Sequence, residues 1–110
     1  MLVRRASEGP SLAVYNNRLY AAWKGMLADQ SLWFSFFNGT SWAPQQTIPG
    51  VFSSIGPSIC VLGNFLYAAW KGMLGDQRIW YTRYNGVNWA PQQIVPGVGT
   101  SSDLATSAAA

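Results

Sequence analysis

The chain has 110 residues, of which 49% are hydrophobic and 15% aromatic, whereas only 10% are charged. Its net charge is +3, but the basic residues are scattered, which argues against the dense basic stripe of a nucleic-acid-binding surface. The chain has no His and a single Cys, so neither a metal-ligand pattern nor an internal disulfide is expected. No cofactor is expected, and no apolar run approaches the roughly 18 residues of a membrane span, which argues against membrane insertion.

The chain carries nearly the same sequence twice. The segment Leu19 to Leu27 returns as Leu66 to Leu74, Trp42 to Gln46 returns as Trp89 to Gln93, and about 28 of the 47 aligned positions are identical. A period of roughly 40–50 residues is typical of solenoids and propellers, whose units cannot bury their apolar faces alone. We divide the chain into an N-terminal segment 1–8, a first repeat 9–55, a second repeat 56–102 and a C-terminal tail 103–110.

Each repeat contains four short apolar runs separated by turn residues. In the first repeat they are Pro10 to Tyr15, Arg18 to Lys24, Leu32 to Phe37 and Trp42 to Ile48, with turns at Asn16-Asn17, Asn38-Gly39 and Pro49-Gly50. The runs are rich in aromatic and aliphatic residues, and none has a helical period. The pattern predicts an all-β fold in which each repeat is a four-stranded antiparallel meander.

Both faces of the predicted meander are apolar. Along the second run, Leu19, Ala21 and Trp23 point to one face, whereas Tyr20 and Ala22 point to the other. Sheets covered on both faces favour blades of a β-propeller over a two-sheet sandwich, which would leave each outer face wet. Two blades cannot close a ring, so we expect the propeller to be completed by homo-oligomerisation, with a six-bladed trimer favoured over an eight-bladed tetramer.

The connections between the second and third runs hold the candidate binding residues. Tryptophan, lysine, aspartate and glutamine fall close together there in both repeats, as Trp23, Lys24, Asp29, Gln30 and Trp33, and as Trp70, Lys71, Asp76, Gln77 and Trp80. An indole can stack on the C–H patch of a sugar ring, while charged and amide groups bond its hydroxyls. The alternative is structural: the indoles pack between blades, and Lys24 and Asp29 form a salt bridge.

The repeat resembles the Trp-rich β-propeller lectins. The resemblance covers Gly9 to about Ser101, and it is carried by Asp29, Leu32, Trp33, Phe34, Trp42 and Gly50, which return as Asp76, Ile79, Trp80, Tyr81, Trp89 and Gly97. It implies ligand pockets between adjacent blades, both within the chain and across chain boundaries. The repeat lacks the sialidase Asp-box spacing and the Trp-Asp repeat signature.

These features predict a binding protein and no enzyme. One repeated aspartate per blade does not supply the paired carboxyl groups of a glycosidase. The expected partners are further copies of the chain and glycans. The alternative function is a structural or protein-interaction scaffold without a sugar ligand. The lone Cys60 stands where the first repeat has Ala13, and we expect it to be a small buried residue.

Overall fold

The computed structural model describes residues 10–26, 28–73 and 75–99. Within these ranges the chain consists of β-strands and their connections, and it holds no helix that is long and apolar enough to cross a membrane. The predicted N-terminal segment 1–8 and C-terminal tail 103–110 lie outside the described residues.

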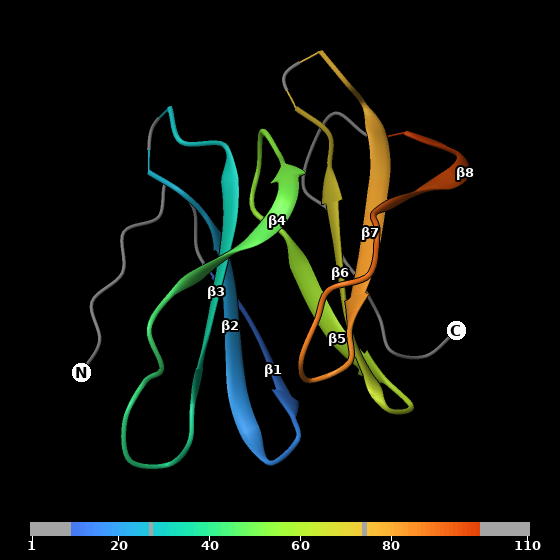
Figure 1. Ribbon diagram of the computed structural model, residues 1–110. Helices are drawn as coiled ribbons and strands as arrows, with labels where there is room; N and C mark the ends of the chain where they lie inside the picture. Colours follow the sequence, from blue (N-terminus) through green and yellow to red (C-terminus); the bar gives the residue numbers. More distant parts are fainter. Residues whose placement is uncertain (1–9, 27, 74, 100–110) are drawn as a thin grey trace.

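Eight strands form two antiparallel sheets of four, as the repeat predicts (Figure 1). Sheet 1 contains β1 (Ser11–Tyr15), β2 (Arg18–Lys24), β3 (Ser31–Phe37) and β4 (Gln46–Phe52), and sheet 2 contains β5 (Ser58–Leu62), β6 (Phe65–Lys71), β7 (Arg78–Tyr84) and β8 (Gln93–Gly99). In each sheet the strands follow one another in chain order, each paired with the next. The all-β meander architecture is therefore confirmed.

Tight turns connect the strands at the lower end of both sheets in Figure 1. Asn16 and Asn17 have φ values of 55° and 61°, which suits a two-residue hairpin turn. Gly39 and Gly86 have φ values of 102° and 101°, a region that only glycine occupies without strain. The predicted hairpin turns are present at these positions.

The fourth strand of each sheet lies further along the chain than the sequence suggested. The prediction of a strand from Trp42 to Ile48 was wrong, because β4 begins at Gln46 and continues through Pro49 and Gly50 to Phe52. Trp42 makes only an isolated bridge, to Phe37. The register of β3 and β4 shifts at this point, and Gly50 has a φ of 70°. Proline is tolerated there because β4 is an edge strand with a bulge.

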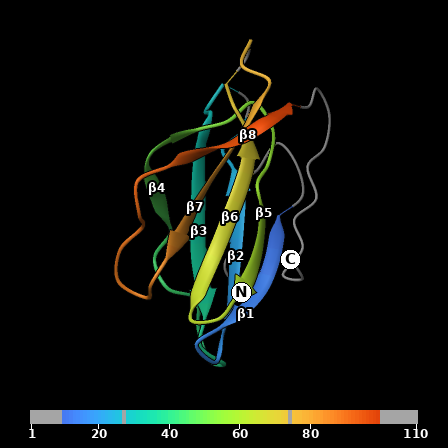
Figure 2. The same cartoon turned by 90° about the vertical axis from the view of Figure 1, so that its right-hand side faces the viewer.

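The two sheets pack face to face, with β1 beside β5 (Figures 1 and 2). Alternation places Tyr20 and Ala22 of sheet 1 opposite Leu66, Ala68 and Trp70 of sheet 2, and these five side chains are almost completely buried. Hydrogen bonds between the sheets include that from Ile59 N to Ser11 Oγ at 3.0 Å and that from Tyr15 OH to the Asn64 carbonyl at 2.8 Å. The common core therefore lies between the two repeats.

One cation–π contact is kept in both sheets with its partners exchanged. The guanidinium of Arg18 lies 4.7 Å from the centre of the Phe36 ring, and that of Arg83 lies 4.3 Å from the centre of the Phe65 ring. Position 18 corresponds to 65 in the repeat, and position 36 corresponds to 83. The contact, rather than the identity of either residue, is what the two repeats share.

Each sheet also has an outer face that no part of the described chain covers with a second sheet. The outer face of sheet 1 consists of Leu12, Val14, Leu19, Ala21, Trp23, Trp33, Ser35 and Phe37, and the outer face of sheet 2 consists of Ser58, Cys60, Leu62, Tyr67, Ala69, Ile79, Tyr81 and Arg83. Leu12 is 56% exposed and Val14 69% exposed. Both faces are mainly apolar, as the sequence predicted.

Candidate functional site

The candidate residues gather at the upper rim of the two sheets, at the top of Figure 1. The rim contains the β2–β3 connection (25–30), the β6–β7 connection (72–77) and the β4–β5 connection (53–57). In the first two connections a backbone bond closes the loop, from Gly25 N to the Ser31 carbonyl and from Gly72 N to the Arg78 carbonyl, each at 3.0 Å. Sequence repetition has thus produced two loops of one design on one rim.

The aspartate of each loop binds the indole that follows it. Asp29 Oδ2 accepts a hydrogen bond from Trp33 Nε1 at 2.9 Å, and Asp76 Oδ2 accepts one from Trp80 Nε1 at 3.0 Å. Oδ1 of Asp29 accepts from Ser31 N, and Oδ1 of Asp76 accepts from the backbone N of the residue two positions on, both at 3.0 Å. Each carboxylate therefore braces its own loop and fixes its own tryptophan.

The glycines at 25 and 72 make room for these carboxylates. A Cβ added to Gly25 would lie closer than 3.0 Å to the side chain of Asp29, and one added to Gly72 would meet Asp76 in the same way. The invariance of glycine in the two copies has this packing reason. A side chain there would displace the aspartate from its tryptophan.

The two carboxyl groups are acceptors that stay ionised. The hydrogen bond from Trp33, and then the backbone bond from Ser31, hold the pKa of Asp29 below its usual value of 3.8. The pKa of Asp76 lies much further below that value, first because Arg78 donates to it and then because Trp80 does. Hydrogen bonds to a carboxylate favour its charged form. Neither group is suited to donate a proton near neutral pH.

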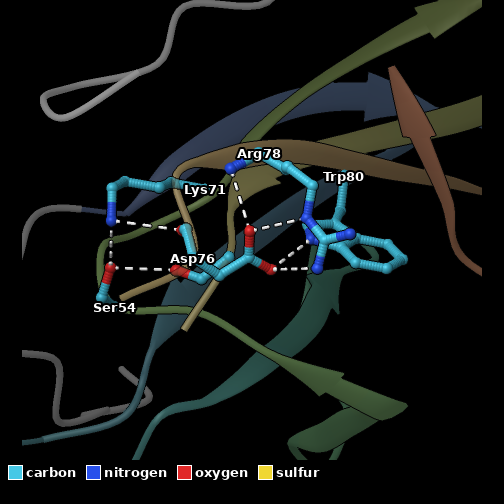
Figure 3. A network of polar contacts seen from close by, with 6 residues as sticks. Ser54, Lys71, Asp76, Arg78 and Trp80 are labelled. Carbon is cyan, nitrogen blue, oxygen red and sulfur yellow. Dashed lines mark hydrogen bonds and ion pairs between the residues drawn. The ribbon is translucent and has the colours of Figure 1, made fainter. Parts of the chain in front are cut away.

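Arg78 distinguishes the second loop from the first. Its Nε lies 2.9 Å from Asp76 Oδ1, and its guanidinium lies 5.2 Å from the centre of the Trp80 ring (Figure 3). The first repeat has Ser31 at this position, which carries no charge. The indoles of Trp33 and Trp80 are both half-buried, but only the second is flanked by this guanidinium.

The lysines lie below the loops and are nearly covered, since Lys24 is 5% and Lys71 7% exposed. Lys71 Nζ lies 3.2 Å from Ser54 Oγ and 3.4 Å from the carbonyl of Asp76 (Figure 3). Lys24 Nζ donates to the Gly25 carbonyl at 3.3 Å. In sheet 2 the lysine thus joins its own loop to the β4–β5 connection.

The β4–β5 connection was not among the predicted site residues. Ser53 is fully buried, and its Oγ donates to the Lys71 carbonyl, while Ser54 Oγ donates to the Gly72 carbonyl at 3.0 Å. Ser53 N also donates to the Gln30 carbonyl at 2.9 Å. These serines connect the two rim loops across the seam between the sheets. The only sequence signal was the partial repetition of the Ser-Ser pair as Thr-Ser.

The remaining candidates differ in exposure. Trp23 is 3% exposed and Trp70 is fully buried, so neither presents an indole face to a ligand. Gln77 is exposed, whereas Gln30 is half-buried. Two buried rim atoms, Gln30 Oε1 and Trp70 Nε1, have no hydrogen-bond partner in the described part of the chain. Such atoms normally pair with protein, water or ligand.

Cys60 is half-buried on the outer face of sheet 2, in contrast to the buried residue that we expected, and burial raises the pKa of its thiol. The described residues contain no group of three or more His, Cys, Asp or Glu side chains that could hold a metal ion. The chain matches none of the protein-family models and none of the curated proteins with which it was compared.

Proposed function

We propose that the protein is a carbohydrate-binding, lectin-like β-propeller, assembled from several copies of this two-blade chain. The observation that carries the proposal is the upper rim: two loops of one design each present a fixed, half-buried tryptophan, Trp33 and Trp80, beside amide and charged groups. A sugar ring needs a flat apolar surface for its C–H groups and nearby polar groups for its hydroxyls.

The bound sugar lies on the rim, at the seam between neighbouring blades. Gln30 Oε1 is a buried acceptor without a partner in the described chain, and a sugar hydroxyl that reached it would donate a hydrogen bond to it. The aspartates act indirectly, because each holds its indole through the Nε1–H bond. Binding without catalysis fits two carboxylates that stay ionised and serve their own loops.

The outer faces support completion of a ring by further copies. Both faces are mainly apolar, and although Ala21, Trp23 and Ser35 are nearly buried, Leu12 and Val14 are 56% and 69% exposed. Exposed apolar residues on a sheet face are an aggregation hazard in a single chain. Propellers have roughly 4–8 blades, so three copies with six blades are the favoured assembly and four copies with eight blades the next. A closed ring repeats the rim site and raises the avidity for clustered sugars.

Isothermal titration against hexoses and N-acetylhexosamines tests the sugar site. Replacing Gln30→Leu and Gln77→Leu together removes both rim amides, and at Gln30 the lost oxygen has no partner in the described chain. We expect unchanged thermal stability and at least about a tenfold loss of affinity, since one lost hydrogen bond to a ligand costs roughly 1–3 kcal/mol. Asn88→Leu, on an exposed turn of the lower rim, is the matched control.

The result also separates the sugar site from the alternatives. Equal binding by the parent and the double variant would move the site away from the rim amides. A parent that bound nothing on a broad glycan array would contradict the sugar proposal. It would favour a protein-interaction scaffold. Rim loops that are held by their own hydrogen bonds are compatible with that function too.

A further inference from the structure

The outer face of sheet 1 carries nearly the same residues as the face of sheet 2 that is already buried inside the molecule. By repeat position, Leu12 corresponds to Ile59 and Val14 to Val61. Ile59 is 5% exposed and belongs to the core between the sheets, against which Val61 also packs. Leu12 and Val14 are 56% and 69% exposed. The first repeat therefore carries the same apolar projections without anything to receive them.

The outer face of sheet 2 has a hollow in the corresponding place. It has a volume of about 300 Å³, and its lining includes Cys60, Leu62, Tyr67, Ala69, Tyr81 and Val95. The equivalent residues of sheet 1 are Ala13, Tyr15, Tyr20, Ala22, Phe34 and Ile48, which belong to or pack against the core cluster that contains Ile59. Within the chain, side chains of the second repeat pack against these residues of sheet 1. The equivalent hollow on sheet 2 is open.

A second pair of complementary features lies beside the first. Inside the chain, the neighbouring rings of Tyr84 and Trp89, 4.8 Å apart, pack on Phe34 with centroid distances of 5.6 and 5.3 Å. The equivalent pair in sheet 1, Phe37 and Trp42, has its rings 5.4 Å apart and lies on or next to the outer face.

The matching hollow on sheet 2 has a volume of about 340 Å³, and its lining includes Tyr67, Tyr81, Arg83 and Pro91. Tyr81 stands there at the repeat position of Phe34.

A polar contact between the repeats also has its equivalent residues on the two outer faces. Gln92 Nε2 donates to the Gly50 carbonyl across the seam at 3.0 Å. The equivalent residues are Gln45, which is exposed, and Gly97. By repeat position, the two outer faces therefore match the two faces that pack within the chain. They share the apolar projections, the hollows and the amide donor.

We propose that the outer face of sheet 1 in one copy packs on the outer face of sheet 2 in the next copy, head to tail, in the register of the contact between sheets within one chain. Leu12 and Val14 enter the hollow beside Cys60, and the Phe37–Trp42 pair enters the hollow beside Arg83. The inference rests on the ring of the proposed function and specifies its interface. Such a heterologous contact repeats around a closed ring, and it builds at each chain boundary a seam like that between the two sheets within one chain.

Two substitutions that each introduce a negative charge test the interface without any sugar. Val14→Asp blocks the projection, and Val87→Asp, at a 77% exposed turn position, is the matched control with the same change. We expect the parent and Val87→Asp to share one oligomeric mass in native mass spectrometry, and Val14→Asp to fall to the 12.0 kDa chain. Assembly of Val14→Asp at the parent mass would overturn the proposal.

Mixing distinguishes a head-to-tail contact from a two-fold one. Leu62→Asp blocks the hollow, and Leu62 is 50% exposed, so this variant should also be monomeric. A mixture of Val14→Asp and Leu62→Asp retains one intact projection and one intact hollow, so we expect an open dimer of one copy of each. Absence of that dimer, or assembly of Leu62→Asp alone, would overturn the head-to-tail arrangement.

Cys60 gives a readout that does not depend on the variants folding. In the parent, reaction of its thiol with a maleimide should slow by about tenfold or more as the protein concentration rises through the assembly range, because the interface covers the sulfur. A rate independent of concentration would contradict the proposal. Failure of glycan binding leaves these masses and rates unaffected, so the interface and the sugar site fail separately.

Discussion

Val14 and Val61 are the same residue at the same repeat position, yet Val14 is 69% exposed and Val61 packs against the core. The difference arises because the second repeat has a neighbour on that face, and the first repeat has none among the described residues. At these positions burial depends on whether a second sheet packs on the face, and only secondarily on the residue.

The largest expected effect comes from truncating the two equivalent aliphatic positions. Ile59→Ala should lower the free energy of unfolding by about 2–4 kcal/mol at any protein concentration, because it leaves a cavity between the sheets. Leu12→Ala should have a comparable cost only in the assembled parent, and a cost below about 1 kcal/mol in the monomeric Val14→Asp background. Urea denaturation at two concentrations measures both. If Leu12→Ala lowered the free energy of unfolding equally in the two backgrounds, no second copy would pack on Leu12.

The glycines at the lower rim also differ between the repeats, by a smaller amount. Gly39 and Gly86 have almost equal φ values, but an added Cβ meets nothing within 4 Å at Gly39, whereas at Gly86 it lies 3.4 Å from Asn16 Nδ2. Both Gly→Ala changes should cost about 1–2 kcal/mol through backbone strain. We expect the melting temperature of Gly86→Ala to be equal to that of Gly39→Ala or slightly lower. A neutral Gly39→Ala would contradict the turn conformation.

The smallest effect concerns the upper-rim loops and their response to acid. Each aspartate has a lower pKa when folded than when unfolded, so its stabilising contribution is present above pH 3.8 and is lost as the pH falls through the folded pKa. Arg78→Ser copies Ser31 into the second loop and should raise the pKa of Asp76 towards that of Asp29. Carboxyl ¹³C titration by NMR measures both groups, with Asp29 as the internal control. An unchanged pKa of Asp76 would show that the hydrogen bonds from Trp80 and from the backbone dominate its lowering.

Much of the fold was predictable because strand alternation and turn chemistry are local. The run Arg18 to Lys24 coincides with β2, and the Asn-Gly turns have the positive φ that their residues favour. The fourth strand was misplaced because Pro49-Gly50, which has the composition of a turn, forms instead a bulge within an edge strand. That bulge directs Ile48 and Val51 into the core, where they are 1% and 3% exposed, and long-range packing decides such a choice.

The repeat, the meander and the clustering of tryptophan, lysine, aspartate and glutamine around two connections could be read from the sequence, since each depends on residues close together in the chain. The hydrogen bonds from the indoles of Trp33 and Trp80 to Asp29 and Asp76 emerge in the folded chain alone, because they require the loop to curl back over a glycine. The contacts of Ser53 with Lys71, 18 residues away, were likewise invisible in the sequence. They exist because two sheets pack face to face, and the spacing between residues on different sheets is a property of that packing.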